Sequence, residues 1–204
     1  MPDNFKAKYL IFCGGLQADR LAKKDGVKLR ERVVGFRGDY YELTEQGHHK
    51  IKNLIYPVPN PDFPFLGVHF TRMIGGGIEA GPNAVFAFKK EGYHRTDFNF
   101  KEFTESLMWP GFQKVMMKYW KTGLGEMYRS FSKKAFTKAL QRLIPEITED
   151  QLVAAPAGVR AQACDRTGGL LDDFKLVTEK RAIHVINAPS PAATSSLSIG
   201  KTIA

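Results

Sequence analysis

The sequence predicts a fold that mixes helices and strands (α/β or α+β), built around a mixed or antiparallel sheet. Residues 27–88 are dense in Val, Phe and Tyr and are broken by Gly and Pro, residues 99–144 carry apolar residues at helical spacing, and strand-like runs return after residue 150. With 43% hydrophobic and 25% charged residues among 204, the chain can fill the core of one domain, or of two small ones. This composition excludes a disordered chain, a collagen-like fibre and a disulfide miniprotein.

The two cysteines and the lack of a signal peptide or membrane-spanning run indicate the cellular compartment of the protein. Cys13 and Cys164 are too few for a disulfide framework, lack the spacing of a zinc site and are typical of small core residues. The pair His48-His49 has no further ligands nearby in the sequence, so we expect no metal. The chain shows no signal-peptide core and no apolar run near the roughly 20 residues that span a bilayer. We therefore expect an intracellular, cytoplasmic protein.

The first 26 residues predict one α/β unit. Residues 8–13 form a short apolar run that predicts a buried strand, Gly14 and Gly15 predict a turn, and residues 16–24 predict a helix. Because one such unit cannot make a sheet, we expect this part of the chain to belong to a larger unit.

Residues 27–88 predict four strands joined by short turns, which is typical of an antiparallel or mixed sheet. Gly35 and Gly38 predict bulges or bends in the first strand, a Pro-rich turn follows the second, and Gly75–Gly77 lie near the bend before the last. The strands are expected at residues 27–43, 53–58, 66–73 and 83–88, and the Pro-rich turn at 57–64.

Residues 99–144 predict helices, which Trp109-Pro110-Gly111 interrupts near the start. One apolar stripe at helical spacing is expected in the core, and a second amphipathic stretch is expected after a break at Gly123 and Gly125. The first stripe comprises Phe112, Val115, Met116, Tyr119 and Trp120, and the second stretch Met127, Phe131, Ala135 and Leu140.

Basic residues gather in the same region. The net charge is +9, and Lys114 to Arg142 carry eight basic residues against Glu126 alone. Such a helix could bind nucleic acid, an anionic membrane or an acidic substrate, but a solvated helix face has the same pattern, so both interpretations stay open.

The last part of the chain returns to strands and a helix. Residues 152–165 predict a strand that returns to the sheet, residues 183–187 another strand, and residues 192–203 a helix of small residues. Ser190 suits its N-cap and Pro191 its first position.

Two nucleotide-binding patterns are matched by letters only. Gly75–Ala80 fits G-x-G-x-x-A, but a strand-like run follows where a helix is needed, so a hairpin turn explains the glycines better. Residues 195–202 resemble a P-loop that lacks its first glycine and does not lead into a helix. We therefore predict no nucleoside triphosphatase.

Two strand faces carry candidate site residues. Alternation along residues 67–72 places His69 and Thr71 on one face with Gly67, which leaves room for a ligand. Alternation along residues 158–164 makes Arg160 project among small residues, where it could bind a carboxylate with both arms of its guanidinium. A hydrogen-bonded structural His69, and an ion pair of Arg160 with Asp165 or Asp172, explain the same pattern.

Five motifs in order along the chain resemble the L-2-hydroxyglutarate oxidase/dehydrogenase family, whose fold is that of the D-amino-acid-oxidase-like flavoproteins. They are Leu66-Gly-Val-His-Phe-Thr-Arg, Gly81-Pro-Asn-Ala-Val, Ala157-Gly-Val-Arg-Ala-Gln, Leu171-Asp-Asp-Phe and Asn187-Ala-Pro-Ser-Pro-Ala-Ala-Thr-Ser-Ser-Leu. The resemblance implies FAD as cofactor and oxidation of L-2-hydroxyglutarate, or a similar 2-hydroxy acid, to the 2-oxo acid. It also implies quinone or oxygen as electron acceptor, no nucleic-acid partner, and a peripheral contact with the inner membrane in some members.

The resemblance covers nearly the whole chain but only the C-terminal half of the family pattern. Members open with a strand, a G-x-G-x-x-G turn and a helix that hold the FAD pyrophosphate, and this chain has no equivalent. We therefore expect residues 1–26 to end a partial FAD-binding domain, residues 27–165 to form the substrate domain and residues 166–204 to return to the FAD-binding domain. The 204 residues alone are expected to be inactive and not to retain FAD.

The resemblance also implies roles for single residues. His69 is the candidate base for the substrate hydroxyl, Arg160 the candidate for the substrate carboxylate, and Thr71 and Arg72 are further substrate-binding candidates. The helix start that includes Ser190, Pro191, Ala192, Ala193 and Thr194 resembles the segment whose backbone N–H groups face the flavin ring. The alternative from a different class is a standalone basic module that binds nucleic acid, an anionic membrane or another acidic partner without catalysis.

Overall fold

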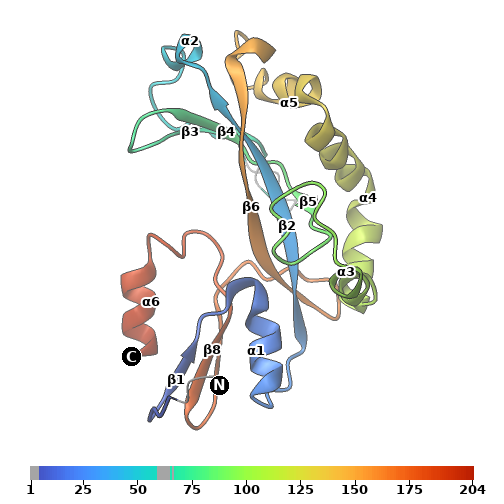
Figure 1. Cartoon of the computed structure of the whole chain (residues 1–204), viewed down its shortest axis with the longest axis vertical. Coiled ribbons are helices and arrows are strands. Elements are labelled where there is room, and N and C mark those ends of the chain that lie inside the picture. The colour runs from blue at the N-terminus through green and yellow to red at the C-terminus, as the bar shows by residue number, and fades with distance from the viewer. Residues whose placement is uncertain (1–4, 59–64, 66) are drawn as a thin grey trace.

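The computed structural model describes residues 5–58, 65 and 67–204, and its strands form two sheets (Figure 1). The larger sheet comprises β2 (Glu31–Leu43), β3 (His69–Arg72), β4 (Ile78–Gly81), β5 (Val85–Phe86) and β6 (Leu152–Asp165). The smaller comprises β1 (Leu10–Phe12), β7 (Lys175–Thr178) and β8 (Ala182–Asn187). The helices are α1 (Ala18–Lys24), α2 (Glu45–His48), α3 (Phe100–Leu107), α4 (Pro110–Phe131), α5 (Lys133–Leu140) and α6 (Ser196–Ile203).

The long antiparallel pair of β2 and β6 forms the axis of the larger sheet (Figure 1). Their register runs from Glu31 opposite Asp165 to Leu43 opposite Leu152, and it shifts between Gly38 and Tyr40. β2 also pairs with β5 and, further along, with β4, which in turn pairs with β3. The predicted antiparallel sheet is confirmed, and the bulge falls beside Gly38 and not at Gly35.

Three of the four strands expected in residues 27–88 are shorter than predicted, and the fourth is absent. Residues 53–58 do not form a strand, because only Ile55 pairs with Phe70 as an isolated bridge. β4 and β7 were not expected from the sequence, and each is only four residues long. The Pro-rich turn predicted at 57–64 and the start of the strand predicted at Leu66 lie largely outside the described residues.

The smaller sheet joins the two ends of the described chain. β1 runs parallel to β8, and β7 runs antiparallel to β8. The prediction of a buried first strand is wrong, because Leu10 and Ile11 are 50% and 56% exposed at the free edge of this sheet. Cys13 is likewise exposed, whereas Cys164 is buried as expected.

The helices differ from the predicted pattern at their breaks. α4 begins at Pro110, in the first turn where proline is tolerated, and continues through Gly123 and Gly125, where a break was expected. A Cβ added at either glycine would meet open space, so both lie on an unpacked side of the helix. The chain leaves the helix only at Ser132, whose hydroxyl accepts a hydrogen bond from Ala135 N and caps α5.

The expected apolar stripe of α4 is buried only in part. Phe112 and Val115 are buried, but Trp120 is 54% exposed, so its placement in the core is wrong. The backbone at Tyr119 has non-helical φ and ψ of −113° and 17°, and this kink falls where the buried stripe ends. Phe131 of the second stretch is also exposed.

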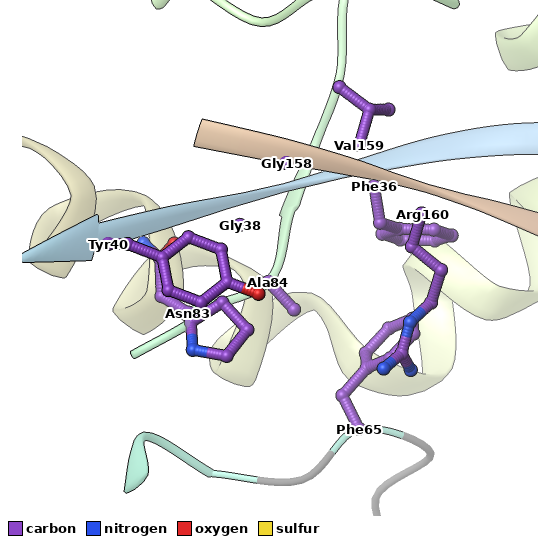
Figure 2. A pocket seen from close by; sticks show the side chains of 10 residues that line it. Phe36, Gly38, Tyr40, Phe65, Asn83, Ala84, Gly158, Val159 and Arg160 are labelled. Atoms are coloured by element: carbon purple, nitrogen blue, oxygen red, sulfur yellow. The ribbon is translucent and has the colours of Figure 1, made fainter. Parts of the chain in front are cut away.

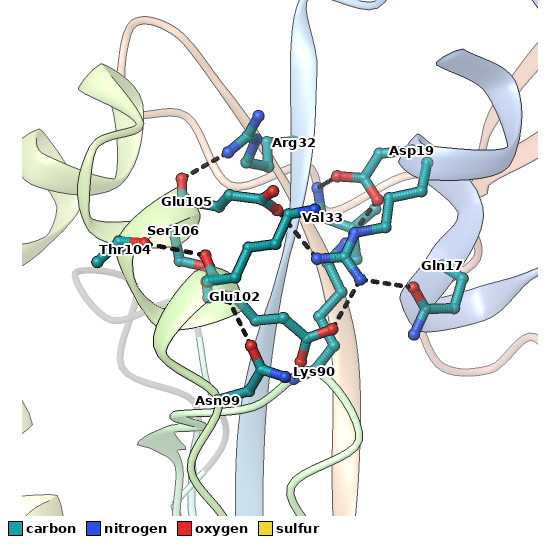
Figure 3. A network of polar contacts seen from close by, with 12 residues as sticks. Gln17, Asp19, Arg32, Val33, Lys90, Asn99, Glu102, Thr104, Glu105 and Ser106 are labelled. Atoms are coloured by element: carbon teal, nitrogen blue, oxygen red, sulfur yellow. Dashed lines mark hydrogen bonds and ion pairs between the residues drawn. The ribbon is translucent and has the colours of Figure 1, made fainter. Parts of the chain in front are cut away.

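A network of charged side chains joins α1 to the larger sheet and to α3 (Figure 3). Lys90, only 5% exposed, donates hydrogen bonds to Asp19 Oδ1 at 2.5 Å and to Leu16 O at 2.9 Å. Arg20 bonds Glu102 and Glu105 at 2.7 and 2.9 Å. Burial lowers the pKa of Lys90, and the carboxylate of Asp19 opposes that effect by favouring the charged amine. Residues far apart in sequence are thus held together around β2.

Phe136 and Phe131 form a matched pair for testing the core. Phe136 is fully buried against Tyr41, with ring centroids 4.7 Å apart, so Phe136→Ala should lower the free energy of unfolding by about 3–5 kcal/mol. Phe131→Ala, at an exposed position, should change it by about 0.5 kcal/mol or less. Urea unfolding of both variants measures the difference, and equal losses would contradict the packing.

Candidate active site

Strands β2 and β6 form the floor of a pocket of about 230 Å³ (Figure 2). Phe36, Gly38 and Tyr40 alternate along β2, so they share one face of the sheet. Across the strand pair, Phe36 lies opposite Arg160 and Gly38 lies opposite Gly158. The register of the β2–β6 pair therefore brings four of the lining residues of the pocket together.

The two facing glycines leave the pocket floor as bare backbone. A Cβ on Gly38 would lie 2.5 Å from Pro82 Cβ, so the close approach of Pro82 requires glycine there. A Cβ on Gly158 would meet only Tyr40 Cε2, at an ordinary contact distance of 3.7 Å. Pro82 therefore covers the backbone at Gly38, and only the backbone at Gly158 is open to the close approach of a ligand.

Arg160 reaches into the pocket without an anionic partner. In the described part of the chain its guanidinium makes no hydrogen bond or ion pair, and its Cζ lies 5.3 Å from the centroid of the Phe65 ring (Figure 2). The alternative pairing with Asp165 is not observed, because that carboxylate accepts hydrogen bonds from Thr167 and Gly169. A planar cation held on an aromatic face and not neutralised is suited to binding a carboxylate.

His69 lies on β3 with one ring nitrogen already occupied. Its Nδ1 is 3.0 Å from Gly67 O, and its ring stacks on Tyr56 with centroids 4.3 Å apart. A carbonyl oxygen can only accept, so Nδ1 carries the proton and Nε2 is left with a free lone pair. Burial lowers the pKa of His69, and the positive charge of Arg160 lowers it further, against the opposing effect of the Gly67 hydrogen bond. The ring is thus a neutral base within the electrostatic reach of Arg160.

Thr71 and Arg72 follow His69 along β3 but lie on opposite faces. Thr71 shares the face of His69 and is half-buried. Arg72 alternates onto the other face with buried Phe70, and its guanidinium donates to Ile51 O at 3.3 Å. The structure therefore brings Thr71 to the side of His69 and directs Arg72 away from it.

Tyr40 lines the pocket but was not predicted as a site residue from the sequence. Burial raises the pKa of its hydroxyl, the nearby Glu79 raises it further, and the charge of Arg160 opposes both. Alternation of Phe36, Gly38 and Tyr40 was readable from the sequence, but their position beside Arg160 depends on a strand register that the sequence did not reveal.

Buried polar side chains support the pocket floor from behind. Asp39, between Gly38 and Tyr40, accepts hydrogen bonds from Arg37 Nε at 3.2 Å and from Ser130 Oγ at 2.5 Å. Its own amide donates to Asn83 Oδ1 at 2.7 Å, and Asn83 lines the pocket. Hydrogen bonds of Asp39 therefore join the backbone at the register shift to Ser130 of α4 and to Asn83 of the pocket wall.

The segment from Ser190 to Thr194 is a turn and not the start of a helix, which corrects the prediction. The helix begins at Ser196, the Ser190 side chain caps nothing, and the Ala192 amide donates to Pro189 O at 2.9 Å, so it is not available to a ligand. The peptide bond between Ser190 and Pro191 is cis. In the described part of the chain, the exposed amides of Ala193 and Thr194 have no hydrogen-bond acceptor.

The residues present fit one portion of FAD. The free amides of Ala193 and Thr194 are suited to the carbonyl oxygens on the polar edge of a flavin ring. Gly75–Gly77 form the turn between β3 and β4, with Met73 N bonded to Gly77 O, and residues 196–203 form α6. Both letter matches are therefore rejected as phosphate loops, and the fit to FAD rests on the two amides of Ala193 and Thr194. The described residues also contain no cluster of metal-ligating side chains.

A solved structure shares the arrangement of these elements. The L-alpha-glycerophosphate oxidase of Mycoplasma pneumoniae, in a dithionite-reduced form with FAD bound, matches with a TM-score of 0.66 over 97% of this chain and 42% of that chain. At 19% sequence identity this likeness shows the fold, which is that of an FAD-binding oxidase.

The sequence comparisons identify the family. A family model described as FAD dependent oxidoreductase matches residues 2–204, and the chain belongs to that family. It is 61% identical to an L-2-hydroxyglutarate dehydrogenase of Indibacter alkaliphilus over 98% of this chain and 50% of the relative. It is 50% identical to the mitochondrial L-2-hydroxyglutarate dehydrogenase of Nematostella vectensis, over 45% of that protein. It is 46% identical to the L-2-hydroxyglutarate dehydrogenase of Escherichia coli K12, over 47% of that protein. The chain thus spans about half the length of these relatives.

The geometry around His69 predicts its titration. Its pKa should lie below the ordinary value of about 6.5, because burial and Arg160 both disfavour the charged ring. Arg160→Gln should raise that pKa, since it removes a neighbouring positive charge, whereas Arg72→Gln should not. NMR titration of the His69 ring gives the values directly, and an unchanged pKa in Arg160→Gln would contradict the proximity of the two groups.

Proposed function

We propose that this chain is the substrate-binding part of an FAD-dependent oxidoreductase that oxidises L-2-hydroxyglutarate, or a similar 2-hydroxy acid, to the 2-oxo acid. The observation that carries the proposal is an electrostatic effect of Arg160 on His69. Among the described residues, Arg160 has no anionic partner and His69 Nε2 has no hydrogen-bond partner. The relatives named as L-2-hydroxyglutarate dehydrogenases support the substrate. A 2-hydroxy acid offers a carboxylate and a hydroxyl on adjacent carbons, and we propose that Arg160 binds the first while His69 accepts the proton of the second.

The two residues divide the chemistry between them. Arg160 binds the C1 carboxylate with both arms of its guanidinium and so orients the C2 hydroxyl toward His69. His69 Nε2 accepts the hydroxyl proton while the C2–H bond breaks and its electron pair leaves as hydride, so that C2–O becomes a carbonyl. Bound FAD would supply the hydride acceptor for this reaction, and we propose a quinone or oxygen as the final electron acceptor.

Neighbouring residues prepare the pocket for this reaction. The rings of Phe36 and Phe65, with centroids 4.7 Å apart, cover one side of it and exclude water, which strengthens the Arg160–carboxylate interaction. The hydroxyls of Tyr40 and Thr71 are proposed to bind the second carboxylate. The amides of Ala193 and Thr194 are proposed to hold the flavin edge, so side-chain changes at these two positions should have little effect.

Substitution in the complete, FAD-loaded protein tests these roles. His69→Asn should lower kcat by about 10²–10⁴-fold and leave KM nearly unchanged, because it removes the base and keeps the shape. Arg160→Gln should raise KM for L-2-hydroxyglutarate. Arg72→Gln should change neither kcat nor KM, because the Arg72 side chain lies on the opposite face of the sheet. If His69→Asn and Arg72→Gln behaved alike, the proposed base would be wrong.

A second proposal concerns the outer face of α4. Large apolar side chains are exposed at helical spacing on this helix, beside Lys114, Lys118 and Lys121, which is the pattern of a helix that lies on an anionic membrane surface. No helix among the described residues is long and apolar enough to span a bilayer. We propose a peripheral membrane contact through this face, which would place the protein in the cytoplasm at the inner membrane. The apolar residues are Met117, Trp120, Leu124, Tyr128 and Phe131.

Binding to lipid vesicles distinguishes a membrane contact through α4 from a helix face that contacts only solvent. The protein should sediment with phosphatidylglycerol vesicles at low salt and less with phosphatidylcholine vesicles, and Leu124→Glu should release it. Leu197→Glu, at a similarly exposed position on α6, is the matched control and should still sediment. Equal sedimentation of the two variants would contradict a role for α4, and salt-sensitive binding to nucleic acid instead would favour the basic-module alternative.

A further inference from the structure

Glu126 is the single acidic residue between Lys114 and Arg142, and it is buried. Its carboxylate pairs with Arg129 on the same helix and accepts a hydrogen bond from Ala84 N at 3.2 Å. Burying a carboxylate costs free energy that such contacts must offset, so its place inside α4 indicates a defined structural task. The bond to Ala84 links α4 to a segment that lines the candidate active-site pocket.

Residues 82–84 form one wall of that pocket, and hydrogen bonds hold this wall on two sides. The side chain of Asn83 accepts from Asp39 N at 2.7 Å and donates to Glu126 O at 3.3 Å. The bond from Ala84 N to the Glu126 carboxylate is a third attachment. The wall is therefore joined to β2 through Asp39 and to α4 through Glu126.

Ser130 continues this attachment along the same face of α4. It follows Glu126 by one helical turn and is fully buried, and its hydroxyl donates to Asp39 Oδ2 at 2.5 Å. One helix face thus holds both the wall at Asn83 and the backbone behind the pocket floor. A ligand too long for the pocket would have to break these buried hydrogen bonds in order to push the wall outward.

The wall lies at the end of the pocket that is opposite Arg160. Arg160 pairs with Phe36 in the strand register, and Tyr40 lies four residues further along β2, a backbone distance of roughly 13 Å. Figure 2 shows Tyr40 and Asn83 at one end of the pocket and Arg160 at the other. A ligand whose first carboxylate is bound by Arg160 therefore extends toward Tyr40 and the wall.

We propose that Glu126 is a positioning residue that sets the length of the dicarboxylate in the pocket, because it holds the wall at Asn83 and Ala84 in place. The inference rests on the proposed function, since it takes the ligand to be a dicarboxylate that Arg160 binds at one end. Glu126 lies behind the wall and does not line this pocket, so it acts through the wall and not on the ligand. A wall that does not yield disfavours one extra methylene by about tenfold or more.

Isothermal titration of the complete, FAD-loaded protein with two unreactive diacids tests this role. Glutarate has the chain length of L-2-hydroxyglutarate and no hydroxyl to oxidise, and adipate is longer by one methylene. The unmodified protein should bind glutarate about tenfold or more tightly than adipate. Glu126→Ala should lower this ratio several-fold, because Ala84 N loses its acceptor and the wall can move. Glu126→Gln should keep the ratio, because its amide oxygen can still accept from Ala84 N.

Glu102→Ala is the matched control, because Glu102 makes the same two kinds of contact away from the pocket. Its carboxylate accepts a hydrogen bond from Lys90 N at 2.8 Å and pairs with Arg20. Both alanine variants should lower the melting temperature, but Glu102→Ala should keep the ratio of glutarate to adipate affinity. If the two variants changed this ratio equally, the effect would be a general loosening of the fold, and the proposal would be wrong.

Asn83→Asp makes the same test with a side chain of equal size, in case Glu126→Ala does not fold. This change keeps an acceptor for Asp39 N but sets a carboxylate oxygen against Glu126 O where a donor stood, so the ratio should again fall several-fold. The added negative charge weakens both diacids alike and therefore does not alter the ratio by itself. An unchanged ratio in Asn83→Asp would contradict the role of the wall.

The outcomes separate this inference from the proposed function. If the unmodified protein bound neither diacid, or if Arg160→Gln bound glutarate as tightly as the unmodified protein, the proposed function would fail. If the unmodified protein bound glutarate and adipate equally well, or if Glu126→Ala kept the full preference for glutarate, the role of Glu126 would be refuted and the proposed function would stand.

Discussion

The pairing of β2 with β6 is the constraint on which the rest of the structure depends. It places Phe36 opposite Arg160 and Gly38 opposite Gly158, which makes the pocket floor from segments more than one hundred residues apart in sequence. The other edge of β2 holds β4 and β5, and β4 in turn holds β3 with His69. A one-residue slip of the β2–β6 register would turn Arg160 to the opposite face of the sheet and so remove it from His69.

The irregularity in that pairing is held in place by buried charge. Asp39 and Arg37 are nearly inaccessible to water, and burying them costs free energy that their mutual ion pair and the bond to Ser130 offset. Such a network contributes more to a defined local geometry than to overall stability. Its position, directly behind Gly38 and Tyr40, means that the shape of the pocket floor is fixed from the side facing away from the ligand.

Much of the fold could be predicted from the sequence, because periodicity and glycine or proline breaks mark most elements. The strands around His69 and Arg160 and the helices from Phe100 onward were found in this way, and so were the two misleading glycine motifs. The predictions that were wrong concern features that depend on tertiary contacts. The exposure of Trp120 follows from a kink in α4, and the turn at Ser190 follows from backbone hydrogen bonds that compete with a helix. Tyr40 and Phe65 join the site only through register and loop placement, which no local pattern encodes.

The parallel pair of β1 and β8 has a consequence for the order of folding. Leu10 pairs with Ala182, so this contact closes almost the whole described chain, and closing so long a loop early costs more entropy than the few contacts of β1 return. During synthesis β1 leaves the ribosome long before β8 exists. β1 therefore cannot pair with β8 until that strand has been made, and this contact forms late in folding.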